Sequence, residues 1–265
     1  MIYFFSGTGN SRAVAYQLSK HLDMGVVDIA NIDFVPDFKG EDVVVWVFPI
    51  YAWGLPPILV DFIEMIEATS TAQHYMVCTC GDDIGRADHQ WEKLLRRKGM
   101  SPHAAFSVQM PNIYTLLPGF DVDDYRIEDK KLALMPKRVE EVAEAIRRGE
   151  SKSGVEAGKF ARLKSAVVYP IFRAYGCSAR PFQASEYCKS CGLCAAHCPK
   201  GNITMVDGRP QWGDDCTMCL RCYHICHYDV VSYGRMTKGK SAYRTLMFKN
   251  LQPIKKNTIF VKTKK

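Results

Sequence analysis

The sequence predicts an α/β protein: a doubly wound parallel sheet of five strands, followed by a small α+β domain rich in cysteine. Two observations predict this. Up to residue 150, short apolar runs alternate with segments of helical periodicity, as in a parallel sheet covered by helices. Further on, eight cysteines form two equal sets. The predicted divisions are an α/β domain at 1–150, a linker with an amphipathic helix at 151–179, the cysteine-rich domain at 180–235 and a basic tail at 236–265.

The first domain begins with an apolar run at 2–5, a Ser/Gly-rich turn at 6–11, and a segment with helical spacing of apolar residues up to Leu22. The run at 43–48 is apolar on both alternations, which is typical of a strand covered on both faces. Further strands are predicted at 26–29, 75–79 and 104–110, and further helices at 58–66, 87–98 and 127–148.

Beyond the first domain, a polar Gly/Ser-rich stretch at 150–158 indicates a boundary. The amphipathic segment 159–176 predicts a helix packed between the two domains, interrupted by Pro170; a helix lying on a membrane surface is the alternative. A short helix is expected at 241–249 and a small strand at 257–261.

The cysteines follow the pattern C-x2-C-x2-C-x3-C, which occurs twice, 28 residues apart. In two-cluster ferredoxins the fourth cysteine of each such run ligates the other iron–sulfur cluster. A disulfide framework would need an oxidising compartment, and structural zinc usually takes two C-x2-C pairs without a third and fourth cysteine in register. The predicted ligands are Cys188, Cys191, Cys194 and Cys226 for one [4Fe–4S] cluster, and Cys216, Cys219, Cys222 and Cys198 for the other.

The turn at 6–11 reads Ser-Gly-Thr-Gly-Asn-Ser and lies between the first strand and the first helix. Backbone N–H groups and the helix N-terminus can bind a phosphate there, and the hydroxyls add donors. A dinucleotide fingerprint would need glycine in place of Arg12, and the lysine of a P-loop is absent. A tight turn without a ligand is the remaining alternative.

Two more loops, at 49–54 and 79–85, leave the same edge of the sheet, where ligands of open parallel sheets bind. A flavin ring needs an aromatic or apolar slab, which Tyr51 and Trp53 can supply, although both could be ordinary core residues. The loop carboxylates at 82 and 83 lie either near the flavin or in solvent. The predicted flavin-binding residues are Ser6, Gly7, Thr8, Gly9, Asn10, Ser11, Pro49, Ile50, Tyr51, Ala52, Trp53, Gly54, Thr79, Cys80, Gly81, Asp82 and Asp83.

With these motifs, residues 1–150 resemble flavodoxin and residues 180–235 resemble a bacterial two-cluster ferredoxin. The combination of S-G-T-G-N-S, C-G-D-D-I-G and the two cysteine runs is similar to the EFR1 family of flavodoxin–ferredoxin fusions. The resemblance implies FMN, bound without a covalent link, and two low-potential [4Fe–4S] clusters. One departure is Cys226-His227, where ferredoxins commonly have Cys-Pro. Three histidines flank ligand cysteines and are structural or surface residues unless one couples cluster reduction to protonation: His197, His224 and His227.

A chain with these cofactors is expected to be an electron-transfer iron–sulfur flavoprotein that exchanges electrons with a protein donor and acceptor of the ferredoxin or reductase type. Two alternatives are an FMN-dependent oxidoreductase acting on a small organic acceptor and a redox-sensing binding module. No Ser/His/Asp or paired-carboxylate arrangement suggests a hydrolytic site.

The formal charge of +7 does not indicate nucleic-acid binding. Nine of the 35 Lys and Arg residues lie in the tail 236–265, which has no Asp or Glu, so the rest of the chain carries −2. The tail either steers an acidic partner or is simply solvated. Because residues 1–5 lack a basic n-region and no apolar run reaches about 18 residues, a cytoplasmic protein without a membrane span is expected. Oxygen-sensitive clusters further suggest an anaerobe.

Overall fold

The computed structural model describes residues 1–246, except 33, 68–69 and 118. Its main sheet has five strands in the order β2-β1-β3-β4-β5, and every neighbouring pair is parallel. This confirms the predicted five-stranded parallel sheet. The strands are β1 (Ile2–Phe4), β2 (Val26–Asp28), β3 (Val43–Pro49), β4 (Ser70–Cys80) and β5 (Met100–Gln109).

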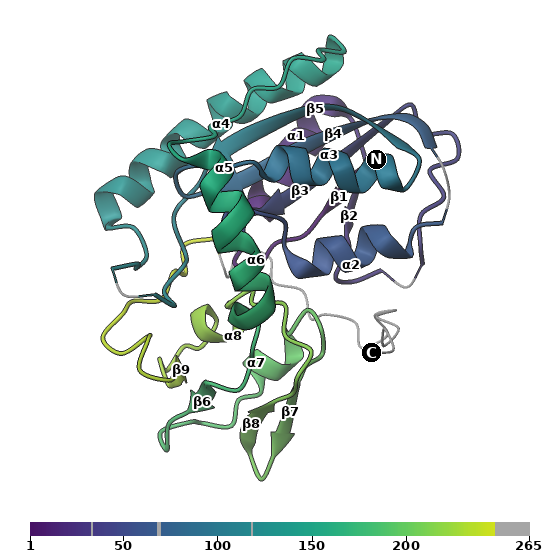
Figure 1. The fold of residues 1–265 in the computed structure, drawn as a ribbon. Coiled ribbons are helices and arrows are strands. Elements are labelled where there is room, and N and C mark those ends of the chain that lie inside the picture. Colours follow the sequence, from purple (N-terminus) through teal and green to yellow (C-terminus); the bar gives the residue numbers. More distant parts are fainter. Residues whose placement is uncertain (33, 68–69, 118, 247–265) are drawn as a thin grey trace.

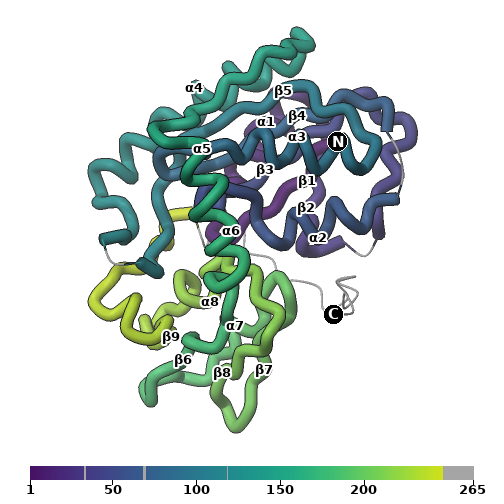
Figure 2. Tube along the Cα trace, in the orientation of Figure 1, coloured from purple at the N-terminus to yellow at the C-terminus, as the bar shows by residue number. Residues whose placement is uncertain are grey.

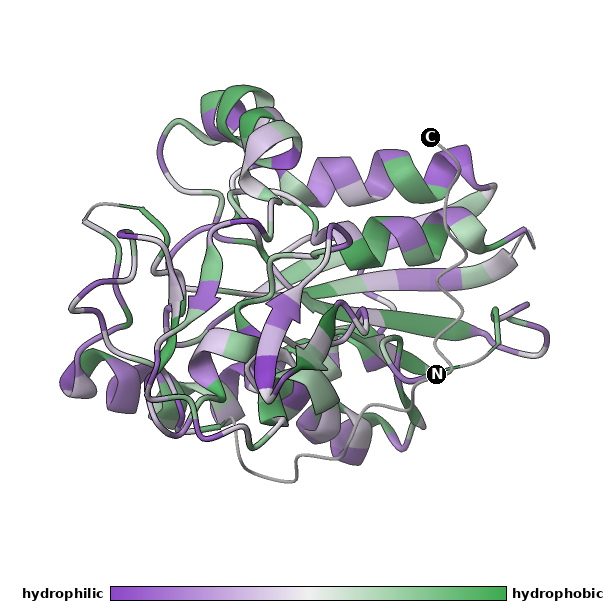
Figure 3. Cartoon of the chain, turned by 90° about the horizontal axis from the view of Figure 1, so that it is seen from below, coloured by the Kyte–Doolittle hydropathy of each residue, from purple (hydrophilic) through white to green (hydrophobic). Residues whose placement is uncertain are grey.

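Four helices cover the two faces of the sheet (Figure 1). Alternation along β3 explains the layers, because Val44, Trp46 and Phe48 face one side while Val45 and Val47 face the other. Helices α2 (Pro57–Met65) and α3 (Ala87–Arg97) pack on the first side, and α1 (Asn10–Leu22) and α4 (Tyr125–Arg147) pack on the second. The helices carry hydrophobic and hydrophilic residues on different faces (Figure 3).

Strands β4 and β5 begin earlier than their apolar runs predict. Ser70 already pairs with Met100, and the pairing contains two irregularities before Tyr75. The extra residues are mostly polar, so the apolar pattern did not mark them, but their backbone groups still join the ladder.

The connection at 150–158 is hydrogen-bonded to the sheet. Gly154 forms a bridge to the edge strand β5: its N–H donates to Ala105 O (2.9 Å), and its carbonyl accepts from Ser107 N (3.2 Å). The boundary segment therefore covers part of an exposed strand edge.

A continuous helix follows, made of α5 (Ala161–Leu163), η1 (Lys164–Val168), α6 (Tyr169–Ile171) and η2 (Phe172–Gly176). The predicted interruption at Pro170 is wrong. Wider π-type turns lie on both sides of the proline, and this changed hydrogen-bond pattern accommodates its missing N–H. We call this element the bridging helix, because it runs from the sheet to the cysteine-rich part of the chain (Figure 1).

Residues 180–235 form a small lobe below the carboxyl edge of the sheet (Figures 1 and 2). We call it the cysteine lobe. It contains two antiparallel strand pairs and two one-turn helices. The elements are β6 (Phe182–Ala184), α7 (Leu193–Ala196), β7 (Ile203–Val206), β8 (Arg209–Trp212), α8 (Arg221–His224) and β9 (Val231–Tyr233).

The 28-residue repeat of the sequence is also a repeat of backbone conformation. Helices α7 and α8 begin 28 residues apart. Positive φ angles recur at the same spacing, with Ser190 matched by Met218, Gly192 by Leu220, and Gly201 by Asp229. The lobe is therefore built from two copies of one loop–helix unit.

Near the C-terminus, the helix expected at 241–249 is absent from 241–246, the part that the structure describes. Tyr243 is held instead by long-range hydrogen bonds, from its N–H to His224 Nδ1 (3.0 Å) and from its hydroxyl to Asn10 Oδ1 (2.8 Å). Most of the basic tail and the strand expected at 257–261 lie outside the described residues. Among the described helices, none has the length and apolar composition to cross a membrane.

Candidate functional site

A cavity of about 90 Å³ lies at the carboxyl edge of the sheet, and we call it the inner cavity. The three predicted loops meet there. Twelve of the predicted flavin-binding residues line it: Ser6, Gly7, Thr8, Asn10, Ser11, Pro49, Ile50, Tyr51, Ala52, Thr79, Cys80 and Gly81. Gly9 and Gly54 do not line it, and the ring of Tyr169 covers Gly54.

The loop at 6–11, which we call the phosphate loop, has the features of an anion site. Helix α1 starts after Gly9, whose φ of 103° suits glycine, and no side chain caps the helix. The Ser6 hydroxyl accepts from Gly9 N (3.0 Å), and the hydroxyls of Ser11 and Thr79 are 2.7 Å apart. The uncapped helix N-terminus and these hydroxyls supply donors to a phosphate without a lysine or arginine in the loop.

Asn10 ties the start of α1 to two other parts of the chain. Its side-chain amide donates to Pro111 O (2.9 Å), and its Oδ1 accepts from the Tyr243 hydroxyl. Tyr243 N donates to His224 Nδ1, so the other ring nitrogen carries the proton and donates to Ile113 O (3.0 Å). Burial lowers the pKa of His224 to about 4, which keeps the ring neutral. His224 is therefore a structural link in this network.

Tyr51 closes one side of the inner cavity. Its ring is 9% exposed, and its hydroxyl is buried without a hydrogen-bond partner among the described residues. A buried hydroxyl usually has a partner, so this one is available to a ligand. The turn that follows has two non-glycine residues at positive φ, Ala52 (45°) and Trp53 (62°), closed by hydrogen bonds between Tyr51 and Gly54.

A second cavity, of about 380 Å³, adjoins the first, and we call it the outer cavity. The two share Ile50, Ala52, Cys80, Gly81, Asn112, Tyr114 and Phe172. The outer cavity also contains the predicted residues Trp53, Asp82 and Asp83, and the bridging helix forms its far wall. Its lining is mostly apolar and aromatic, as in sites for planar organic ligands.

The bridging helix is fixed to the predicted flavin loops by polar contacts. Lys164 Nζ lies 2.6 Å from the Asp83 carboxylate and 4.9 Å from the centre of the Trp53 ring. The Ser165 hydroxyl donates to Trp53 O (2.7 Å). Asp83 and Trp53 therefore contact the helix as well as the outer cavity, and Asp83 is not a free loop carboxylate.

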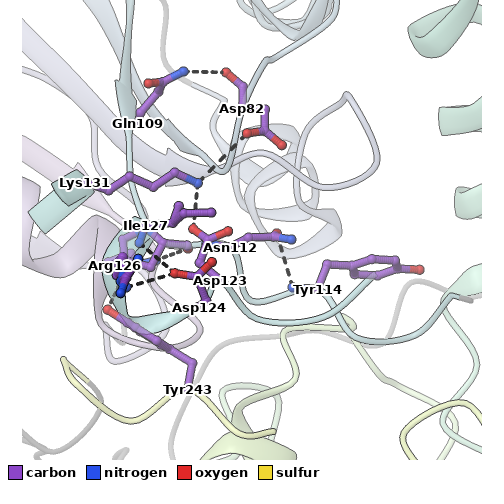
Figure 4. Close-up of polar contacts among 12 residues, drawn as sticks. Asp82, Gln109, Asn112, Tyr114, Asp123, Asp124, Arg126, Ile127, Lys131 and Tyr243 are labelled. Carbon is purple, nitrogen blue, oxygen red and sulfur yellow. Dashed lines mark hydrogen bonds and ion pairs between the residues drawn. The ribbon is translucent and has the colours of Figure 1, made fainter. Parts of the chain in front are cut away.

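Asp82 belongs to a polar network with Lys131, Asp123 and Asn112 (Figure 4). Lys131 Nζ lies 2.6 Å from Asp123 and 4.0 Å from Asp82, whose side chain is 89% exposed. Asp123 also accepts from Asn112 N (2.9 Å). This network holds the segment 110–114, whose residues all line the inner cavity.

The eight repeat cysteines separate into two groups that mix the repeats. Burial raises the pKa of Cys194 to about 11, and the thiols of Cys191, Cys226 and Cys188 add to the shift. In the other group, Cys198, Cys216, Cys219 and Cys222 all line one small cavity. Two backbone N–H groups point at sulfur there, Asn202 N to Cys198 (3.3 Å) and Met218 N to Cys216 (3.4 Å). We call the groups the first and second quartets; they correspond to the two predicted ligand sets, whose role as cluster ligands stays a prediction.

Across the described residues, no three His, Cys, Asp or Glu side chains lie close enough together to hold a single metal ion.

The second cysteine loop lies directly against the phosphate loop. A Cβ placed on Gly7 would be 2.6 Å from the carbonyl oxygen of Cys219, so only glycine allows this approach. The neighbours of Cys219, Met218 and Leu220, line the inner cavity and are 4% and 3% exposed. The cysteine lobe therefore supplies one wall of the cavity that the sheet edge forms.

Several residues of the site escaped the sequence analysis. Five of them, Met110, Pro111, Asn112, Ile113 and Tyr114, follow β5 at the same sheet edge as the predicted loops. Strand β5 was itself predicted, and ligands of parallel sheets bind beyond the carboxyl ends of the strands. The position of these five residues directly after β5 was therefore the available signal that they line the site. The other three, which come from other elements and are marked by no local pattern, are Phe172, Met218 and Leu220.

Comparisons with known proteins identify the family of the first half of the chain. The sequence pattern of the flavodoxin domain matches residues 1–136. The FMN-dependent NADH:quinone oxidoreductase 2 of Mesoplasma florum is 31% identical over 90 residues, which are 33% of this chain and 45% of that protein. The chain thus spans less than half the length of this curated relative.

Two solved structures are similar at low identity. A short-chain flavodoxin associated with a non-canonical PDU bacterial microcompartment is 18% identical, with 56% of this chain and 95% of that chain covered and a TM-score of 0.37. The NAD(P)H:quinone oxidoreductase from Methanothermobacter marburgensis is 12% identical, with 55% and 94% covered and a TM-score of 0.37.

Proposed function

The chain belongs to the flavodoxin domain family, and from this we propose that it binds FMN at the carboxyl edge of its sheet and transfers electrons through it. The proposal includes two [4Fe–4S] clusters on the two cysteine quartets, as the resemblance to the EFR1 family implies. Electrons pass between the clusters, FMN and a redox partner protein. When bound, FMN exchanges one or two electrons and each cluster exchanges one.

The residues around the cavities fit FMN. The phosphate loop offers backbone and hydroxyl donors to the phosphate, and the partnerless Tyr51 hydroxyl is a further donor inside the inner cavity. Tyr51 and Trp53 offer aromatic surface to the ring from the two adjoining cavities. Burial raises the pKa of the Tyr51 hydroxyl well above its usual value, which keeps it protonated and able to donate.

Two features of the second quartet support a cubane cluster there. Each cysteine of a [4Fe–4S] cluster ligates a different iron, so its four sulfurs stand farther apart than the ligands of one zinc ion, whose Zn–S bonds are about 2.3 Å. The four thiols around one cavity and the two N–H groups directed at sulfur support the second cluster.

One observation carries the proposal: the second cysteine loop forms a wall of the inner cavity. Cys219 contacts the phosphate loop at Gly7, and its two neighbours line the cavity. A cluster held by the second quartet would therefore lie behind a wall of the cavity proposed for FMN, within the same chain. This favours direct electron transfer between them.

The proposal is tested by anaerobic purification and a count of cofactors. We expect about eight iron, about eight acid-labile sulfide and one FMN per chain, and a reductive titration that takes up about four electrons. Zinc in place of iron, or a protein with clusters that does not take up added FMN, would contradict the proposal.

A second candidate function is reduction of a small organic acceptor. The apolar outer cavity beside the proposed flavin ring favours it, and the name of the Mesoplasma florum relative describes quinone reduction. Steady turnover of a quinone by the purified protein, lost when FMN is removed, would support this function. Rapid oxidation by a ferredoxin-type protein with slow quinone turnover would support the electron carrier.

A further inference from the structure

Arg221, between Cys219 and Cys222, is a buried cation that joins three separate parts of the chain. Only 8% of the residue is exposed. Its Nε donates to Gly7 O (2.8 Å), one terminal nitrogen donates to Ser6 O, and the other donates to His197 O (3.1 Å). The guanidinium therefore connects the phosphate loop to both cysteine repeats.

These contacts determine how the phosphate loop presents its donors. In a trans peptide the carbonyl of one residue and the N–H of the next point in opposite directions. Because Arg221 binds the carbonyls of Ser6 and Gly7, the N–H groups of Gly7 and Thr8 point away from it. Both residues line the inner cavity. A hydrogen bond to a carbonyl also polarises its peptide group, which makes the N–H on the other side a stronger donor.

The charge of Arg221 also needs a negative group nearby. Its three hydrogen-bond acceptors are neutral carbonyls, and burying a cation among neutral groups is costly. Burial raises the pKa of Asp28, and the charge of Arg221 opposes that rise, so this carboxyl lies within the field of the arginine. A phosphate in a loop without its own lysine or arginine would add to this neutralisation.

We propose that Arg221 is a positioning residue that gives the inner cavity its preference for a phosphorylated flavin over the same flavin without phosphate. Since the arginine belongs to the cysteine lobe, phosphate binding depends on that lobe being docked. The inference rests on the proposed FMN site and adds the residue that selects the ligand.

The test compares FMN with riboflavin, which differs only in lacking the phosphate. Protein is purified anaerobically with iron content matched between variants, FMN is removed, and each flavin is titrated by its fluorescence. Arg221→Met is expected to weaken FMN binding about tenfold or more and to leave riboflavin binding within about twofold, because a charge-assisted hydrogen-bond set is lost. Arg221→Lys keeps the positive charge but not the planar set of guanidinium donors, so its loss of FMN affinity is expected to lie between those of the wild type and Arg221→Met.

Thr217→Val is the matched control. Thr217 is buried on the same loop and accepts a hydrogen bond from Ile58 N (3.1 Å) across the same interface, away from the phosphate loop. It is expected to change the affinities for both flavins by the same factor. If the arginine variants also lower both affinities equally, or keep the FMN preference of the wild type, Arg221 has only a structural role and the inference fails.

A measurement on the unaltered protein covers the case in which the variants do not fold. Amide hydrogen exchange in 215–226 should be slowed by FMN but not by riboflavin at matched occupancy. Equal protection by the two flavins would overturn the inference. A wild-type protein that binds neither flavin would instead reject the proposed function itself, so the two failures are distinguishable.

Discussion

Replacing Gly7 with alanine should separate the phosphate loop from the second cysteine loop. The new Cβ would lie 2.6 Å from Cys219 O, whereas ordinary contacts of this kind begin at 3.4 Å, so the loops must move apart by about 0.8 Å. The backbone itself is not an obstacle, because Gly7 is not among the glycines with positive φ. The atom in the way is a backbone carbonyl, which cannot rotate aside as a side chain would.

The size of the effect follows from two opposing terms. Overpacking of this kind costs about 1–3 kcal/mol. Alanine also lowers the entropy of the unfolded chain relative to glycine, which returns about 0.4–1 kcal/mol. We therefore expect Gly7→Ala to lower the free energy of unfolding by about 1–2 kcal/mol and to weaken FMN binding, since Gly7 O also accepts from Arg221.

Urea unfolding under anaerobic conditions and a fluorescence titration with FMN measure the two effects. Gly25→Ala is the control, because the added Cβ there meets only the flexible end of the Met1 side chain. If Gly7→Ala is as stable as Gly25→Ala and binds FMN as the wild type does, the phosphate loop and the second cysteine loop are not in contact at Gly7.

Three further predictions concern other parts of the chain. Burial lowers the pKa of His74 to about 4, so the folded state keeps this ring neutral, and the stability that the neutral ring provides is complete above pH 6.5 and is lost toward pH 4. Between pH 7 and 5, urea unfolding should show the free energy of unfolding of the wild type falling by about 2 kcal/mol more than that of His74→Gln. Cys222→Ser should lower the iron content by about half, whereas Cys177→Ser, outside both repeats, should leave it unchanged. Lys164→Met should destabilise the protein by about 1 kcal/mol, with a smaller difference in high salt, because the contact with Asp83 is lost.

Sequence reasoning succeeded where the signal is local. The apolar run of β3 and the turn after β1 are each contained within a few residues, so each could be placed in the fold from its own residues. The cysteine spacing also gave the assignment of the two quartets, since cross-ligation is a rule about sequence order, and that assignment stays a prediction.

It failed where the decisive contact is distant in the chain. A short helix was expected at 241–249, but in the described part, 241–246, the hydrogen bonds of Tyr243 to His224 and Asn10 hold another conformation. Nothing in the neighbourhood of Arg221 shows that its partners are at positions 6 and 7, more than 200 residues earlier. Pro170 shows a third kind of failure, because the helix avoids the expected break by changing its hydrogen-bond pattern.

The two cysteine loops share one conformation but not one environment, and this difference suggests an order for the centres of the proposed electron path. At the first loop, positive φ falls on Ser190 and Gly192, and the enclosed Cys191 is exposed. At the second, it falls on Met218 and Leu220, where a left-handed conformation costs about 1–2 kcal/mol per residue.

That cost is offset because the side chains of Met218 and Leu220 are buried in the wall of the inner cavity. The second loop is thus specialised for contact with the cavity, while the first remains open to solvent. Under the proposed function, we therefore expect a partner protein to exchange electrons at the first quartet, and the second quartet to exchange them with FMN.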